Sequence, residues 1–186
     1  MNNKAEMGVG TLIIFIALLL VAAVAAGVLI QTAGSLQQRA LSTGAQATGQ
    51  IATSAVALEV SGTDGTANLE DLEMIMKLAP GSESIRLEAV TLTLSTTNST
   101  QTFTYNESLE NGTTSQFAVS YLQEGTNSDT GLMVRGDVLN VQFQAERPLL
   151  EAEDVRISFI PQIGTPTVVA FSLPDVISTE RVYLYP

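Results

Sequence analysis

LIIFIALLLVAAVAAGVLI, residues 12–30, decides how the rest of the chain is organised. None of these nineteen residues has a charged or polar side chain, and thirteen are Leu, Ile, Val or Phe. Leaving these side chains in water would forfeit roughly 20–40 kcal/mol, at about 1.5–3 kcal/mol each. A whole domain is stable by only about 5–15 kcal/mol. The stretch must therefore be buried in lipid, within its own domain or against copies of itself.

The overall composition excludes several kinds of chemistry. The 186 residues include no cysteine, histidine or tryptophan, and 19 acidic and 8 basic residues give a net charge of −11. We therefore expect no disulfide, no Cys/His zinc site and no thiol or histidine catalysis. The basic residues are scattered singly, so no patch can neutralise phosphates and nucleic acid is not an expected partner.

The residues after the apolar stretch continue a helical pattern. Residues 31–58 contain no proline, and their sole charge is Arg39, whereas Ala, Gly, Gln, Ser and Thr are frequent. A helix over residues 10–58 would be about 70 Å long at 1.5 Å per residue, which no small domain can enclose. Small side chains in its second half would let neighbouring helices approach closely.

Two fates of this helix remain open from the residues alone. An N-terminal apolar run of about twenty residues is most often a membrane anchor. The uncharged extension favours a helix that packs against other helices, because an anchored domain more often has a charged interface and a flexible linker. No secretory-type cleavage site follows residue 30, so we expect the stretch to stay on the mature protein.

The second part of the chain shows the pattern of β-strands. After a turn-rich boundary at residues 59–69, apolar residues alternate with polar ones, as at Leu139, Val141 and Phe143. Such alternation predicts strands with one buried face, and eight or so short strands predict an antiparallel β-sandwich. The expected strands cover residues 72–78, 85–95, 101–105, 116–123, 138–144, 155–159, 169–173 and 181–185. Within 85–95 the apolar phase slips, which predicts a bulge.

The chain resembles archaeal flagellins (archaellins), a family of type IV pilin-like filament subunits. The likeness is carried by Gly8-Val9-Gly10-Thr11-Leu12 and Leu36-Gln37-Gln38-Arg39-Ala40 in the helix, and by Leu78-Ala79-Pro80-Gly81-Ser82, Gly136-Asp137 and residues 182–186 beyond it. The resemblance implies an α+β fold in which a long N-terminal hydrophobic helix precedes an immunoglobulin-like antiparallel β-sandwich. The implied parts are a leader at 1–5, a filament-core helix at 6–58 and an outer domain at 59–186.

The resemblance also implies processing and assembly sites. In this family a prepilin-type peptidase cuts before the apolar segment; in this chain the cut would fall between Ala5 and Glu6, after Lys4 and with Gly8 third in the mature protein. The residues expected to pack in a filament core are Leu12, Phe15, Ile16, Leu19, Ala23, Ala26 and Ile30.

The function implied is that of a structural subunit of the archaellum, the filament that drives archaeal swimming. Expected partners are further copies of the chain, other archaellins, the peptidase, the membrane before assembly, and an assembly platform with its ATPase. The mature protein would be extracellular, without a cofactor or enzyme activity. The alternatives are a subunit of an adhesive archaeal type IV-like pilus and a single-span membrane-anchored surface protein.

Three N-x-S/T sequons lie close together, at Asn98, Asn106 and Asn111. Chance produces the pattern often in a Ser/Thr-rich segment, but its clustering in the most polar part of the domain is typical of an exposed, glycosylated loop.

Two other features have simpler interpretations. Arg135-Gly136-Asp137 spells an adhesion tripeptide, but a turn between strands explains it better. Acidic residues gather at residues 70–73 and 151–154 without the spacing of a calcium loop, so we expect solvated faces there.

Overall fold

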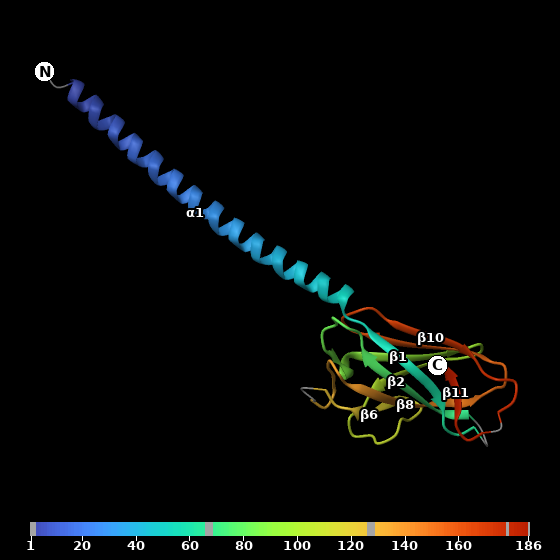
Figure 1. Ribbon diagram of the computed structural model, residues 1–186. Helices are drawn as coiled ribbons and strands as arrows, with labels where there is room; N and C mark the ends of the chain where they lie inside the picture. The colour runs from blue at the N-terminus through green and yellow to red at the C-terminus, as the bar shows by residue number, and fades with distance from the viewer. Residues whose placement is uncertain (1–2, 66–68, 126–128, 178, 186) are drawn as a thin grey trace. The chain divides into compact units, whose positions relative to one another are not determined.

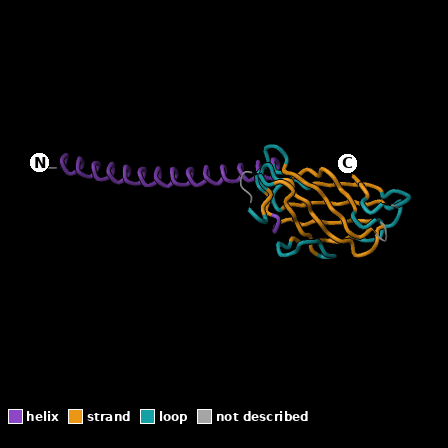
Figure 2. Tube along the Cα trace, turned by 60° about the horizontal axis from the view of Figure 1, so that its bottom comes forward, coloured by secondary structure: helices purple, strands orange, loops and turns teal. Residues whose placement is uncertain are grey.

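A computed structural model describes residues 3–65, 69–125, 129–177 and 179–185, with side chains from residue 7 onward (Figure 1). The chain forms two compact units, Met1–Ala47 and Thr48–Pro186. Most of helix α1 (Asn3–Ala52) forms the first unit, its last five residues belong to the second, and strands dominate the second unit (Figure 2). The predicted α+β organisation, a long apolar helix followed by a mostly antiparallel β-domain, is confirmed.

Helix α1 is shorter at its C-terminal end than predicted. It ends at Ala52 rather than at residue 58, and β1 (Ala55–Gly62) begins three residues later. The reason is strand pairing, because Ala55 lies opposite Leu78 of the neighbouring strand. The buried hydroxyl of Ser82 accepts a hydrogen bond from the Ser54 amide, at 3.0 Å, just after the last helical turn. An alanine-rich sequence that favours a helix by itself is thus drawn into a sheet by its neighbours.

The β-domain contains eleven strands among the described residues. Beyond β1 these are β2 (Leu69–Leu78), β3 (Ile85–Arg86), β4 (Val90–Thr96), β5 (Thr100–Tyr105), β6 (Gln116–Gln123), β7 (Leu132–Met133), β8 (Val138–Leu149), β9 (Asp154–Pro161), β10 (Thr167–Ser172) and β11 (Val182–Tyr185). The sequence pattern missed β1 and β7. The predicted bulge within residues 85–95 is wrong, because a turn of 3-10 helix, η1 (Leu87–Ala89), separates β3 from β4 and buries Leu87.

The nine longer strands form two antiparallel layers. One layer has the order β11-β1-β2-β8-β6, and the other β10-β9-β4-β5. A short parallel pairing of β5 with β6, at Thr104 and Tyr105, joins the layers on one side. Strands β3 and β7 make a separate two-stranded sheet.

The core lies between the two layers and contains the alternating residues identified in the sequence. Phe103 on β5 and Phe143 on β8 meet across the layers, with ring centroids 5.1 Å apart. The predicted inward-facing residues of β8 and β9, Leu139, Val141, Phe143, Val155, Ile157 and Phe159, are all at most 2% exposed. Burial of such side chains at about 1.5–3 kcal/mol each explains why a chain without disulfides forms a stable sandwich.

Candidate assembly surface and modification sites

The surface of α1 is apolar and exposed. Between Met7 and Ile30 every large apolar side chain is open to solvent, from 48% exposed at Ile16 to 73% at Ile30. By length and composition, Met7–Ala52 could cross a membrane, and its most apolar window has a mean hydropathy of 3.2. Among the described residues of the β-domain, exposed large apolar side chains are fewer and do not follow one another along the chain as they do in α1. This helix is therefore the part of the molecule that most needs another environment.

The residues expected in a filament core lie along one face of α1. Spacings of three and four residues, with Phe15 and Ile16 as adjacent positions on either side of the stripe, bring this set to the same side: Leu12, Phe15, Ile16, Leu19, Ala23, Ala26 and Ile30. The opposite side is also apolar, because Ile14 and Val21 are 62% and 67% exposed. A helix that is apolar all round must be surrounded rather than covered on one stripe.

Four hydroxyl groups along α1 form hydrogen bonds within the helix. Thr11, Thr32, Ser35 and Ser42 each donate a hydrogen bond to the carbonyl oxygen three residues earlier, at 2.9 Å. These side chains can enter an apolar environment without an unpaired donor. Arg39 is the sole charge in Met7–Ala52, so the helix meets its surroundings almost without electrostatic repulsion.

The expected leader site lies partly outside the described residues. Met1 and Asn2 are not described, and the side chains of Lys4, Ala5 and Glu6 are not described either, although α1 includes their backbone. Gly8 is exposed, and a Cβ added there would meet nothing within 4 Å. The cleavage position stays a prediction.

The three sequons differ in accessibility. Asn98 is exposed at the turn between β4 and β5, where the Thr96 amide bonds to the Ser99 carbonyl at 2.8 Å. Asn111 is also exposed, whereas the side chain of Asn106 is half-buried and engaged. Its Nδ2 donates to Gln116 at 2.9 Å, and its Oδ1 accepts from the Ser108 amide at 2.9 Å.

The Arg-Gly-Asp tripeptide forms a turn, as predicted. Gly136 adopts φ +95°, which favours glycine, and the Asp137 amide donates to the carbonyl of Val134. The Asp137 side chain is 1% exposed and accepts hydrogen bonds from the amides of Gly125, at 2.6 Å, and Val134, at 2.7 Å. A carboxylate held in this way fixes two loops and cannot reach an external receptor.

The acidic residues take structural roles that differ between the two segments. Glu73 forms an ion pair with Arg181 and accepts a hydrogen bond from Gln142, at 2.9 Å. Burial, followed by the charge of Asp64, raises the pKa of Asp71. Within the described part of the chain, no group of three or more acidic residues is arranged to hold a metal ion.

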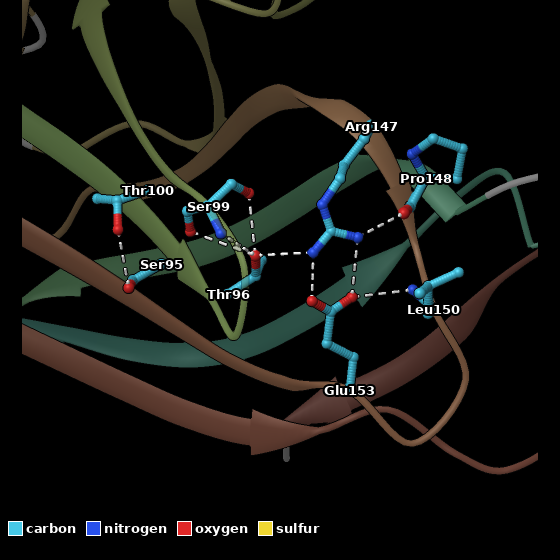
Figure 3. Close-up of polar contacts among 8 residues, drawn as sticks. All are labelled: Ser95, Thr96, Ser99, Thr100, Arg147, Pro148, Leu150 and Glu153. Atoms are coloured by element: carbon cyan, nitrogen blue, oxygen red, sulfur yellow. Dashed lines mark hydrogen bonds and ion pairs between the residues drawn. The ribbon is translucent and has the colours of Figure 1, made fainter.

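The expectation of a solvated face is wrong for Glu153, which is buried. It forms an ion pair with Arg147, and its Oε2 also accepts a hydrogen bond from the Leu150 amide at 3.1 Å (Figure 3). Arg147 Nη2 donates to Thr96 Oγ1 at 2.9 Å, which links this pair to the turn that carries Asn98. The hydrogen bond from Arg147, more than any other influence, lowers the pKa of Glu153. Sequence reasoning missed the network, because its members are 51 and 6 residues apart and no motif connects them.

Comparison with known sequences gives one consistent result. The family profile "Archaeal-type flagellin" matches residues 5–171. Flagellin B1 of Thermoplasma volcanium is 31% identical over 231 aligned positions, which cover 98% of this chain and 93% of that protein. Flagellin B2 of Methanocaldococcus jannaschii is also 31% identical, over 97% of this chain and 94% of its own length.

A solved structure has the same fold. The archaeal flagellum of Methanospirillum hungatei strain JF1 matches with a TM-score of 0.71 and 19% identity, over 95% of this chain and 98% of that one. This likeness extends over α1 and the β-domain, so both parts have counterparts in a known fold.

Proposed function

Because the chain belongs to the archaeal-type flagellin family, we propose that it is a structural subunit of the archaellum that polymerises through α1. The observation that carries the mechanism is the apolar surface of α1, exposed on every side between Met7 and Ile30. Copies of the same helix, packed around one another, supply an apolar neighbour in each direction. Other archaellins with a similar helix can join the same polymer.

The precursor is held in the membrane by α1 before assembly. Its most apolar window satisfies the length and hydropathy of a span, and Lys4 would remain on the cytoplasmic side. Moving the helix from lipid into a bundle exchanges one apolar contact for another, so the burial of its side chains is roughly conserved. Energy for this transfer and for rotation comes from a partner ATPase at the assembly platform.

A prepilin-type peptidase removes residues 1–5, so that the mature polypeptide begins at Glu6. In the β-domain, Asn98 and Asn111 are the favoured glycan acceptors, because both are exposed. Asn106 is disfavoured, because its amide nitrogen already donates to Gln116.

Mass spectrometry of sheared filaments tests processing and modification together. We expect a polypeptide that lacks residues 1–5 and carries additional mass that deglycosylation removes. Asn98→Gln and Asn111→Gln should each lower this additional mass, and Asn106→Gln should leave it unchanged. A polypeptide that starts beyond residue 30 would contradict assembly through α1. A mature mass without modification would contradict the proposed glycosylation but not the assembly through α1.

The assembly mechanism is tested by placing a charge on α1. Ile16→Asp and Val24→Asp should each abolish filaments, because a carboxylate in an apolar environment costs about 3 kcal/mol per copy. Electron microscopy of sheared surface fibres and a swimming assay give the readout in cells that lack the native copy. Leu122→Asp, on an exposed β-domain residue, is the matched control and should leave filaments intact.

Membrane fractionation completes this test, because the same charge also makes insertion of α1 into the membrane less favourable. Precursor in the membrane but no fibre identifies an assembly defect, and Ile16→Leu should assemble normally. Normal fibres from either Asp variant would contradict a buried α1. Loss of surface attachment with intact swimming in a deletion strain would favour an adhesive pilus instead.

A further inference from the structure

A polar hollow of about 210 Å³ lies on the β-domain beside one of the exposed sequons. The polar residues that line it are Thr63, Asp71, Glu73, Asn111 and Gln142. Glu73 on β2 lies opposite Gln142 on β8, and these two strands lie side by side (Figure 1). Asp71 is two residues from Glu73 and shares its side of β2, whereas Leu72 between them belongs to the core. The hollow therefore lies on the side of the sheet that faces away from the core.

The backbone next to Asn111 is fixed against β8. A Cβ added at Gly112 would lie 2.1 Å from the carbonyl oxygen of Gln142, so the middle residue of this sequon fits only as glycine unless the backbone shifts. The Gln144 amide of β8 donates to the carbonyl of Thr113, the third residue of the sequon, at 3.3 Å. Asn111 itself is exposed. A group attached to Asn111 would therefore start from a fixed point at the edge of the hollow.

One of the two carboxylates at the hollow is short of hydrogen-bond donors. Glu73 is engaged, because its Oε1 accepts from Gln142 at 2.9 Å and its Oε2 forms the ion pair with Arg181. Among the described residues, by contrast, none donates a hydrogen bond to the carboxylate of Asp71, whose pKa is raised by burial. A neutral ligand that brings hydroxyl donors would stabilise the charged form of this carboxylate.

We propose that this hollow binds the first sugar of a glycan attached to Asn111, with the Asp71 carboxylate accepting hydrogen bonds from its hydroxyl groups. The inference rests on the glycosylation proposed above and adds a binding site for the glycan on the same chain. The first ring is bonded directly to the asparagine amide, so it is the sugar that lies beside the hollow. Covalent attachment makes binding intramolecular, so a few hydrogen bonds are enough to hold the ring. The site suits a neutral sugar, because an acidic one would be repelled by Asp71 and Glu73.

A double-mutant cycle tests this contact. The native full chain, Asp71→Ala, Asn111→Gln and the double variant are purified in detergent from an archaeal host that attaches the glycan. Mass spectrometry establishes whether Asn111 carries sugar. Near-ultraviolet circular dichroism gives the midpoint temperature of β-domain unfolding, because all four tyrosines belong to this domain. Asn98→Gln, with and without Asp71→Ala, is the matched control, because it removes the other exposed sequon, in the turn between β4 and β5.

We expect Asp71→Ala to lower the midpoint by about 3–6 °C when Asn111 carries the glycan, and by less than half as much in the Asn111→Gln chain. The full loss should persist in the Asn98→Gln chain. Asp71→Asn keeps one acceptor oxygen and should show a smaller loss, again only with the glycan at Asn111. Equal losses with and without this glycan would overturn the sugar site while leaving glycosylation intact. Absence of sugar at Asn111 in the native chain would overturn the proposed glycosylation of this residue and the sugar site with it.

Discussion

At the scale of single residues, the β-domain depends on buried carboxylates that the sequence alone did not distinguish from surface ones. Glu153 and Asp137 are 7% and 1% exposed, and each accepts hydrogen bonds from more than one residue. Neither side chain faces solvent as an acidic residue usually does. Asp137 holds the turn at Val134 and the backbone at Gly125 together, and Glu153 holds Arg147, which in turn bonds to Thr96 51 residues away. These contacts help to hold a loop-rich sandwich without disulfides in one conformation.

Glu153→Gln should lower the free energy of unfolding of the β-domain by about 2 kcal/mol, because it removes the charge from hydrogen bonds to Arg147 and Leu150. The pKa of Glu153 is lower in the folded than in the unfolded state. Its contribution is therefore complete above the unfolded pKa and is lost as pH falls through the folded one. Denaturant unfolding of the full chain in detergent, at neutral and acidic pH, measures the effect. A variant whose destabilisation did not shrink at low pH would contradict this role.

At the scale of elements, the sequence predicted the presence of α1 correctly but placed its C-terminal end six residues too late. Nothing in residues 53–58 breaks a helix. Pairing of residues 55–57 with residues 76–78, together with the hydrogen bonds of Ser82 to the Ser54 backbone, turns the segment into β1. Longer strands with clear alternation, such as β8 and β9, were predicted because their own side chains reveal the buried face. The two-residue strand β7 and the bridge from Ser54 to Thr165 depend on distant partners and left no local pattern.

Glycines within α1 offer a test of close approach between helices. A Cβ added at Gly34 would have nothing within 4 Å, so no contact within the single chain requires glycine at this position. Gly34→Ala should strengthen the helix by about 1 kcal/mol. Gly34→Leu should keep the helix and its membrane insertion yet reduce fibre length, because the larger side chain separates neighbours. Circular dichroism of the full chain in detergent and electron microscopy of fibres give the two readouts. Fibres of native length from Gly34→Leu would show that no neighbour approaches this position.

At the scale of the whole molecule, charge and apolar surface are segregated along the chain. Met7–Ala52 contains one charge, while nearly all acidic residues belong to the β-domain. This division was readable from the sequence, as was the family resemblance. The bridge between Ser54 and Thr165 was not, because its two residues are more than a hundred positions apart.

Salt should stabilise the assembled state. Crowded β-domains of equal charge repel one another, and the screening length falls from about 10 Å at 0.1 M to about 3 Å at 1 M salt. We expect the temperature at which filaments dissociate, followed by light scattering, to rise with sodium chloride concentration. A fall with added salt would mean that attractive ion pairs between copies dominate. Arg39→Gln, measured in parallel, reports whether the lone helical charge forms such a pair.

The hydroxyl groups of Thr11, Thr32, Ser35 and Ser42 have a consequence for how fibres grow and come apart. Each is already bonded to its own backbone, so the helix offers lipid tails and protein neighbours the same chemical face. When the helix moves between these two surroundings, none of these four hydroxyl donors has to lose its partner and find another. Released subunits that enter new fibres would therefore need no rearrangement of these four hydroxyl groups in α1.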